Sequence, residues 1–137
     1  MTFRREDAVI AGGAAVLFLA SFLVYWPALH GEFIWDDTLN ISTNPTIRSD
    51  DGLIDIWAAG PQVFDYYPVT WTSWWIEWRM WKRDTLGYHI VNVLLHAGAA
   101  AVLWRVLARL RVPGAFVAAL MADLKGIRVA KLKWVVD

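Results

Sequence analysis

The chain contains no cysteine and carries no net charge, and it shows none of the short motifs of soluble enzymes. Without cysteine it forms neither a disulfide nor a thiolate metal site, and cysteine content cannot indicate whether its compartment is oxidising or reducing. There is no glycine-rich phosphate loop, no Ser-His-Asp order and no metal-ligand spacing. These absences leave soluble nucleotide chemistry and a bound metal without support in the sequence.

Apolar residues and tryptophan are what the chain has in excess. Hydrophobic residues make up 58% of its 137 positions, and ten of them are Trp. A typical globular domain has only about 45–50% apolar residues. Tryptophan is enriched at membrane interfaces, where its ring meets lipid and its N–H meets water. The composition predicts an integral membrane protein.

The charges are unevenly distributed along the chain. Acidic residues outnumber basic ones between positions 30 and 86, whereas basic residues dominate from position 105 onward. Lys and Arg collect on the cytoplasmic side of membranes, so Arg4 and Arg5 place the N-terminus in the cytoplasm. The bases flank hydrophobic spans and do not alternate with exposed aromatics, so nucleic acid is not a predicted partner.

Two uncharged or nearly uncharged runs predict transmembrane helices, at residues 8–29 and 87–107. About 20 apolar residues cross a bilayer as a helix. The alternative for residues 8–29 is a cleaved signal peptide behind residues 1–7. Its apolar core would exceed the usual length of about 7–15 residues, and bulky residues occupy the cleavage position, so the uncleaved span is favoured.

Residues 108–137 are predicted to lie on the cytoplasmic side as a turn, an incomplete third helix and a basic tail. The apolar run Ala115–Leu124 is too short to span, and the basic tail resists export. The predicted fold class is therefore an all-α membrane protein. It has two transmembrane helices, an extracytoplasmic loop (residues 30–86) with short interfacial amphipathic helices, and a partial third helix.

The most regular part of this loop is a tryptophan-rich helix. At about 100° per residue, five indoles fall within an arc of about 120°: Trp71, Trp74, Trp75, Trp78 and Trp81. One interpretation is a helix that lies in the membrane interface with this face toward lipid. The other is a stripe that packs against neighbouring helices, and the sequence favours neither strongly.

Asp36 and Asp37 follow the first predicted span within a few residues, after the apolar "FIW". They are either solvated loop acids, one of them capping a helix that starts near Thr38, or a catalytic pair. Partial desolvation and mutual repulsion favour a carboxyl group that accepts a proton, unless a metal or a cation holds both ionised. Such a group is what deprotonation of a hydroxyl requires.

His89, Asn92 and His96 share one face of the second span. Residues i and i+7 lie about 10.5 Å apart along a helix, so the two histidines cannot chelate one ion. They are either functional groups facing a wet cavity or interhelical hydrogen-bonding groups. Arg79, near the outer membrane interface, is expected to meet an anionic head group or to pair with Glu77 or Asp36.

The stretches "FIWDDTLNISTNPTI", "YYPVTWTSWWIEWRMW" and "GYHIVNVLLHA" together resemble the N-terminal end of the GT-C membrane glycosyltransferases. The resemblance covers about residues 10 to 122 and is strongest to the protein O-mannosyltransferase-like branch, which often carries C-terminal tetratricopeptide repeats. It implies transfer of a sugar, such as mannose, from a polyprenyl-phosphate donor to a hydroxyl acceptor such as protein Ser or Thr. Membrane lipid, the donor and a protein acceptor are the implied partners.

The resemblance implies that Asp36 and Asp37 are catalytic. It implies no certain cofactor, and a divalent metal is the one candidate. Binding of the donor's lipid phosphate is assigned to Tyr67, Arg79, His89, Asn92 and His96.

After Ala122 the sequence departs from the family, with "DLKGIRVAKLKWVVD" in place of the expected further spans. This predicts a truncated or frameshifted end, or else a family fragment with its own C-terminus, and in either case a chain that is inactive by itself. The predicted location is a bacterial inner (plasma) membrane. The alternative function is that of a non-catalytic membrane protein whose aromatic loop binds lipid or a partner subunit.

Overall fold

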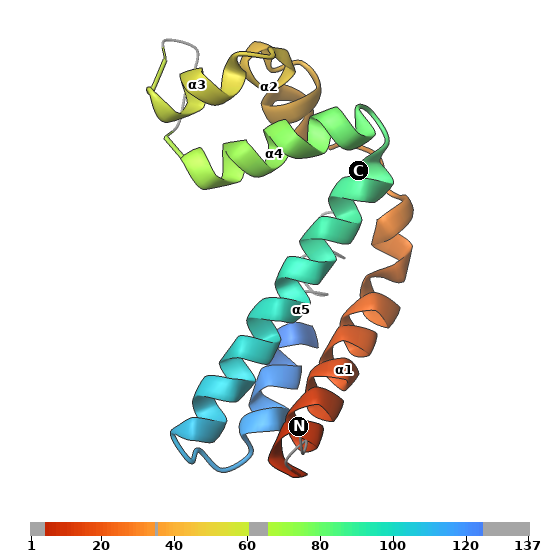
Figure 1. The fold of residues 1–137 in the computed structure, drawn as a ribbon. Coiled ribbons are helices and arrows are strands. Elements are labelled where there is room, and N and C mark those ends of the chain that lie inside the picture. The colour runs from red at the N-terminus through yellow and green to blue at the C-terminus, as the bar shows by residue number, and fades with distance from the viewer. Residues whose placement is uncertain (1–4, 35, 61–65, 125–137) are drawn as a thin grey trace. The chain divides into compact units, whose positions relative to one another are not determined.

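The computed structural model describes residues 5–34, 36–60 and 66–124, so the predicted basic tail lies outside the described residues. This part of the chain is helical and contains no strand (Figure 1). After α5 comes one more helix, which we call the third helix, Ala115–Leu124. The other elements, in chain order, are α1 (Arg5–Tyr25), the 3-10 turn η1 (Trp26–His30), the π-helical turn η2 (Thr38–Ser42), α2 (Pro45–Arg48), α3 (Gly52–Trp57), α4 (Pro68–Trp81) and α5 (Thr85–Arg109).

The chain divides into two compact units. One, here called the membrane unit, consists of Met1–Leu29 and His89–Asp137. The other, here called the loop unit, is His30–Tyr88 and contains η2, α2, α3, α4 and the first turn of α5.

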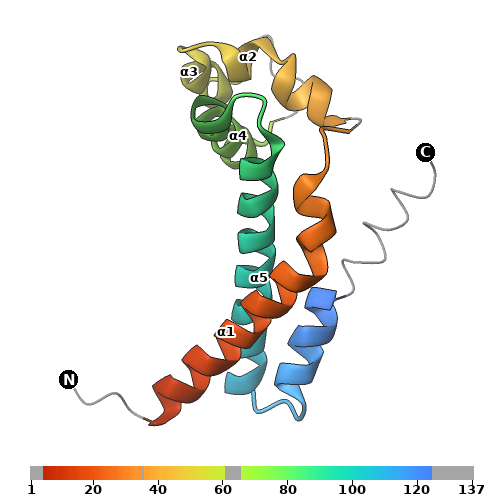
Figure 2. The ribbon, with the colours of Figure 1, turned by 90° about the vertical axis from the view of Figure 1, so that its right-hand side faces the viewer.

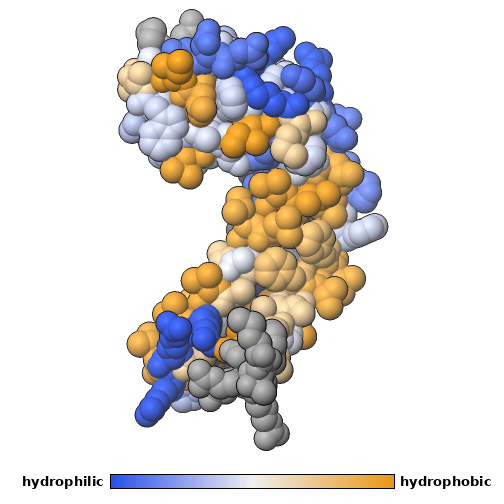
Figure 3. Space-filling model, viewed as in Figure 1, coloured by the Kyte–Doolittle hydropathy of each residue, from blue (hydrophilic) through white to orange (hydrophobic). Residues whose placement is uncertain are grey.

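Two helical segments are long and apolar enough to cross a bilayer, Ala8–His30 and Thr85–Arg109, and all of both except His30 and the first turn of α5 belongs to the membrane unit. Only 11% and 17% of their most apolar windows are buried inside the protein, so neither is the core helix of a soluble domain. Side chains such as Leu23 and Leu95 are exposed, and an extended hydrophobic surface is visible in Figure 3. The structure is therefore that of an all-α membrane protein, as predicted.

Small residues hold the helices of the membrane unit together. The third helix lies beside α1 and α5 (Figure 2), and the fully or nearly fully buried side chains there include Ala97, Ala100 and Ala119. Gly13 faces the ring of Trp104, which also makes an edge-to-face contact with Phe116 at 5.3 Å between ring centroids. Small side chains allow close helix approach in lipid, where van der Waals packing drives association.

The loop unit has its own hydrophobic core, formed by six buried side chains from η2, α2, α3, α4 and α5: Ile41, Ile47, Ile56, Trp71, Trp78 and Tyr88. Trp74, Trp75 and Trp81 pack against this core from α4. The tryptophan arc thus packs inside the protein, as the second interpretation held. The prediction that this face points toward lipid is wrong, because α2 and α3 cover it.

Local sequence signals explain the short helices of the loop unit. The Asn44 side chain accepts hydrogen bonds from the backbone N–H groups of Thr46 (2.9 Å) and Ile47 (3.3 Å), and Pro45 occupies the first turn of α2. Gly52 starts α3 where a Cβ would lie 1.8 Å from the Thr46 carbonyl oxygen, so only glycine fits. The chain leaves α4 at Lys82, whose φ is 56°.

Candidate functional site

Asp36 and Asp37 lie immediately before η2 in the loop unit. Asp36 is exposed and forms no hydrogen bond or ion pair with any described residue, while Asp37 is half-buried. The Asp37 carboxylate accepts a hydrogen bond from the backbone N–H of Ile34 at 3.3 Å, and it makes no capping bond to η2. The expectation that one aspartate caps this helix is therefore wrong for Asp37. Asp36 keeps both carboxylate oxygens available.

The turn that follows the aspartates is π-helical, with a backbone bond from Thr43 N–H to the Thr38 carbonyl of 2.9 Å. The hydroxyls of Ser42 and Thr43 donate to the same carbonyl oxygen, at 3.1 and 2.8 Å. Single π-turns are rare and occur often at functional sites. The Thr38 carbonyl oxygen thus accepts three hydrogen bonds, and these restrain the turn that follows Asp37.

A groove of about 750 Å³ opens on the loop unit beside this turn. Four hydroxyl side chains contribute to its lining: Thr38, Ser42, Thr43 and Thr85. Thr85 belongs to the first turn of α5 and donates its hydroxyl hydrogen to the Gly31 carbonyl at 2.7 Å. Residues far apart in the sequence therefore meet on one concave, hydroxyl-rich surface within about the size range of small-molecule sites.

Charged groups and one aromatic ring complete the groove. Glu32, Arg83 and Asp84 line it together with Phe33. Glu32 and Arg83 form no ion pair with any residue in the described ranges, whereas Asp84 accepts a bond from the Leu86 N–H at 3.1 Å. With two carboxylates and one guanidinium, the groove has a formal charge of −1.

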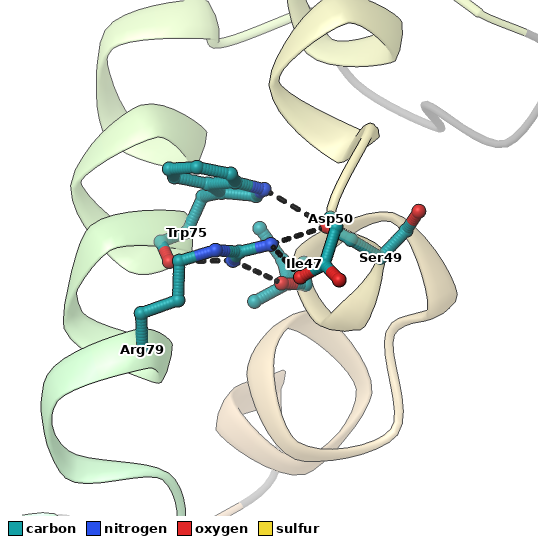
Figure 4. A network of polar contacts seen from close by, with 5 residues as sticks. All are labelled: Ile47, Ser49, Asp50, Trp75 and Arg79. Carbon is teal, nitrogen blue, oxygen red and sulfur yellow. Dashed lines mark hydrogen bonds and ion pairs between the residues drawn. The ribbon is translucent and has the colours of Figure 1, made fainter.

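The guanidinium of Arg79 is bound by several groups of the loop unit (Figure 4). Its guanidinium donates to the carbonyls of Ile47 (3.2 Å), Trp75 (2.9 Å) and Ser49, and it pairs with Asp50 at 3.3 Å. The same group stacks on the Trp75 ring, 3.3 Å from its centroid. These contacts tie α4 to the end of α2, so phosphate binding by Arg79, which stays a prediction, would have to break them.

Glu77 is a buried acid on the same helix, with 6% of its surface exposed. Desolvation raises the pKa of its carboxyl group, and a 2.5 Å hydrogen bond donated by the Ser73 hydroxyl partly offsets that rise. Sequence inspection placed Glu77 off the tryptophan arc as a polar residue. Its burial comes from the packing of α4 and could not be read from the helical periodicity.

The remaining predicted residues are distributed over both units. Tyr67 is exposed at the start of α4. In the membrane unit Asn92 is exposed, whereas His96 Nε2 lies 3.0 Å from the Asp123 carbonyl oxygen and 3.2 Å from its carboxylate. His96 therefore takes part in an interhelical hydrogen bond, one of the two predicted alternatives. Asp123, which no sequence motif singles out, is 1% exposed.

The lining of the groove is the part of the site that sequence reasoning missed. Its hydroxyl groups lie in the quoted stretch "TLNIST" and at the start of α5, but nothing in their spacing indicates that they share a surface. Within the described ranges, no group of three or more His, Asp or Glu side chains is arranged to hold a metal ion.

The fold and these residues define an integral, all-helical membrane protein with an acidic pair and a polar groove on its loop unit. Over about two thirds of its length the chain is homologous to protein O-mannosyl-transferases. It is 30% identical over 99 residues to protein O-mannosyl-transferase F38B6.6 of Caenorhabditis elegans, which covers 66% of this chain and 14% of that protein. It is 33% identical over 109 residues to TMTC1 of Mus musculus (72% of this chain, 12% of that protein) and 31% identical over 103 residues to TMTC1 of Homo sapiens (68% and 12%).

The chain thus spans about one eighth of the length of these relatives. No protein-family model matches the sequence, and no solved structure matches it.

Proposed function

We propose that this chain is the part of a membrane glycosyltransferase that supplies the catalytic acid pair. A sugar passes from a polyprenyl-phosphate donor to a hydroxyl acceptor on the face of the membrane opposite the N-terminus. The observation that carries the proposal is the pair Asp36–Asp37, set on a turn directly after a membrane span, in a chain homologous to proteins named O-mannosyl-transferases.

The two aspartates suit different roles. A general base must reach the proton that it removes, and the exposed Asp36 has no competing partner among the described residues. Asp37 is restrained by the Ile34 N–H and holds the start of η2 in place. Asp36 would then accept the proton of the acceptor hydroxyl while Asp37 positions the turn. A lipid-linked donor stays in the bilayer, so a base close to the end of a span meets it there.

The relatives are much longer than this chain, so the test uses a chimera. Residues 10–122 replace the matching segment of the Mus musculus relative, and transfer of labelled sugar to protein is measured in membranes. We expect Asp36→Asn to reduce transfer by about 10²-fold or more, the usual contribution of a general base. Asp51→Asn, on the exposed turn before α3, is the matched control.

Protease protection checks that each variant inserts normally. Unchanged transfer in Asp36→Asn with normal insertion would refute the proposed base. The second candidate function, a non-catalytic protein that binds lipid or a partner, would then be favoured, because Val69 and Met80 leave an apolar face of α4 exposed.

A further inference from the structure

We propose that the groove of the loop unit binds the ring of a pyranose sugar and not a phosphate. The inference rests on the proposed function, because it assigns the sugar-binding part of that transferase site. It follows from the hydrogen-bonding capacity of the groove, its charge and its one aromatic wall, taken in turn.

The hydroxyls in the groove are left mainly as acceptors. A hydroxyl has one hydrogen to donate and two lone pairs. Ser42 and Thr43 donate their hydroxyl hydrogens to the Thr38 carbonyl, and Thr85 donates its hydroxyl hydrogen to the Gly31 carbonyl. Their oxygens can then only accept from a ligand. The unpaired Glu32 carboxylate adds further acceptor positions.

A ligand for this surface must donate several hydrogen bonds. Sugar hydroxyls do so, and each can also accept from the single guanidinium of Arg83. A phosphate has only acceptor oxygens and brings negative charge into a groove that already has a formal charge of −1. The groove therefore suits a neutral polyhydroxyl ligand, and the donor's phosphate must be held elsewhere.

Phe33 supplies the apolar contact that a pyranose ring requires on its C–H face. The ring of Phe33 is half-buried and held edge-to-face by Tyr88, with 5.2 Å between the ring centroids. A fixed aromatic wall with a few convergent polar groups is typical of small-molecule sites. Thr38, which lines the same groove, is the residue directly after Asp37. A sugar bound in the groove would therefore contact a residue adjacent in sequence to the acid pair.

The test measures binding to the full chain in lipid nanodiscs by saturation-transfer NMR, with methyl α-D-mannopyranoside as the probe. We expect saturation transfer to the glycoside that inorganic phosphate does not displace. Glu32→Gln should weaken glycoside binding about tenfold, since a hydrogen bond to a charged group is lost. Glu32→Lys changes the formal charge of the groove from −1 to +1 and should abolish glycoside binding while phosphate binding appears.

Asp51→Asn is the matched control, because this exposed acid of the loop unit does not line the groove. Tryptophan fluorescence shows that each variant keeps the core of the loop unit. Absence of saturation transfer to the wild-type chain, displacement of the glycoside by phosphate, or equal binding in Glu32→Gln and wild type would each overturn the inference.

Two further measurements complete the test. One asks whether the bound sugar is that of the donor, and the other distinguishes failure of the sugar site from failure of the proposed function. A short-chain polyprenyl-phosphate hexose should displace the glycoside, because its hexose competes for the groove, and failure to displace it would show that the groove does not hold the donor's sugar. Asp36→Asn should bind the glycoside normally while losing transfer in the chimera. Normal glycoside binding together with unchanged transfer in Asp36→Asn would refute the proposed base and leave the sugar site standing.

Discussion

The Ser21 hydroxyl lies 2.7 Å from the Asp123 carboxylate, so a buried hydrogen bond joins two residues 102 positions apart in the sequence. It connects α1 to the third helix, and His96 approaches the same carboxylate from α5 at 3.2 Å. The second carboxylate oxygen of Asp123 is buried and has no partner in the described part of the chain. Three helices of the membrane unit are thus held at one polar point in an apolar setting.

Ser21→Ala is expected to loosen the third helix without unfolding the membrane unit. Hydrogen bonds between membrane helices contribute about 0.6 kcal/mol on average and about 1.7 kcal/mol at most. A loss of that size would raise the maleimide labelling rate of a cysteine at the buried Ala119 by about 3- to 20-fold. Gly98→Ala is the control, because a Cβ there meets nothing within 4 Å. Equal labelling rates in both variants would contradict the role of Ser21.

The helices of this chain could be predicted from sequence because each depends on a local signal. Hydropathy over about 20 residues marks α1 and α5, and the period of the indoles marks α4. The hydrogen bond between Ser21 and Asp123 could not be predicted, because it depends on which helices pack together and on their relative positions along the helix axes. The same holds for the groove, whose lining joins η2 to the start of α5.

The two faces of α4 illustrate a different limit. Periodicity placed the indoles on one face but could not decide whether lipid or protein covers it. That choice depends on α2 and α3, short helices fixed by an Asn cap and by a glycine that admits no side chain. Likewise, the sequence singled out Arg79 for its charge, while its four contacts arise only when α4 reaches the end of α2.

Gly13→Ala and Gly12→Ala form a matched pair that tests the packing of α1 on α5. A Cβ at Gly13 would lie 2.1 Å from the ring of Trp104, and Phe116 restricts the movement of that ring. Overpacking of this kind costs about 1–3 kcal/mol. At Gly12 an added Cβ meets nothing within 4 Å, so no loss is expected. Unfolding by SDS in mixed micelles measures the difference, and equal stabilities would contradict the described contact.

Replacement of Arg79 by Gln should destabilise the loop unit by about 2 kcal/mol or more, because several charge-assisted hydrogen bonds are lost. Asp50→Asn is the control and should change little, since the Asp50 side chain is fully exposed and its pairing is screened by solvent. Thermal unfolding followed by tryptophan fluorescence reports both. An unchanged midpoint in Arg79→Gln, with weakened binding to vesicles containing a polyprenyl phosphate, would instead support the predicted phosphate role.

Glu77 makes the stability of the loop unit depend on pH. Burial raises the pKa of its carboxyl group in the folded state above the ordinary value of 4.5. The folded state therefore binds the proton more tightly than the unfolded state. The resulting stabilisation is fully present below about pH 4.5 and is lost as the pH rises through the folded-state pKa.

Glu77→Gln is neutral at every pH and can still accept the bond from Ser73. We expect it to unfold at a higher temperature than the wild type above the folded-state pKa and to lack this part of the pH dependence. Asp55→Asn on α3, at a half-buried position in the same unit, is the control. A wild-type stability that rises with pH in this range, and that Glu77→Gln does not alter, would show that the burial of Glu77 has been misassigned.

The outward face of α4 is expected to contact lipid. Val69, Ile76 and Met80 are 74%, 47% and 61% exposed. At about 100° per residue they lie within an arc of about 40°, opposite the tryptophan arc. Four residues lie between Met80 and Thr85, where α5 begins, so five residue steps of extended chain keep Met80 within about 18 Å of the start of a membrane-spanning helix. An apolar face held that close to a bilayer gains by entering its interface.

The absence of native cysteine makes this last prediction direct to test. Single nitroxide labels at positions 69, 76 and 80 of the chain in nanodiscs should collide more often with oxygen, which concentrates in lipid, than with a water-soluble nickel complex. Thr70 is also exposed but lies about 100° from Val69 around the helix, so a label there should favour the nickel complex. Nickel-dominated collisions at all four positions would mean that water covers this face. Protection from both reagents at positions 69, 76 and 80 would mean that protein covers it, as the longer length of the relatives allows.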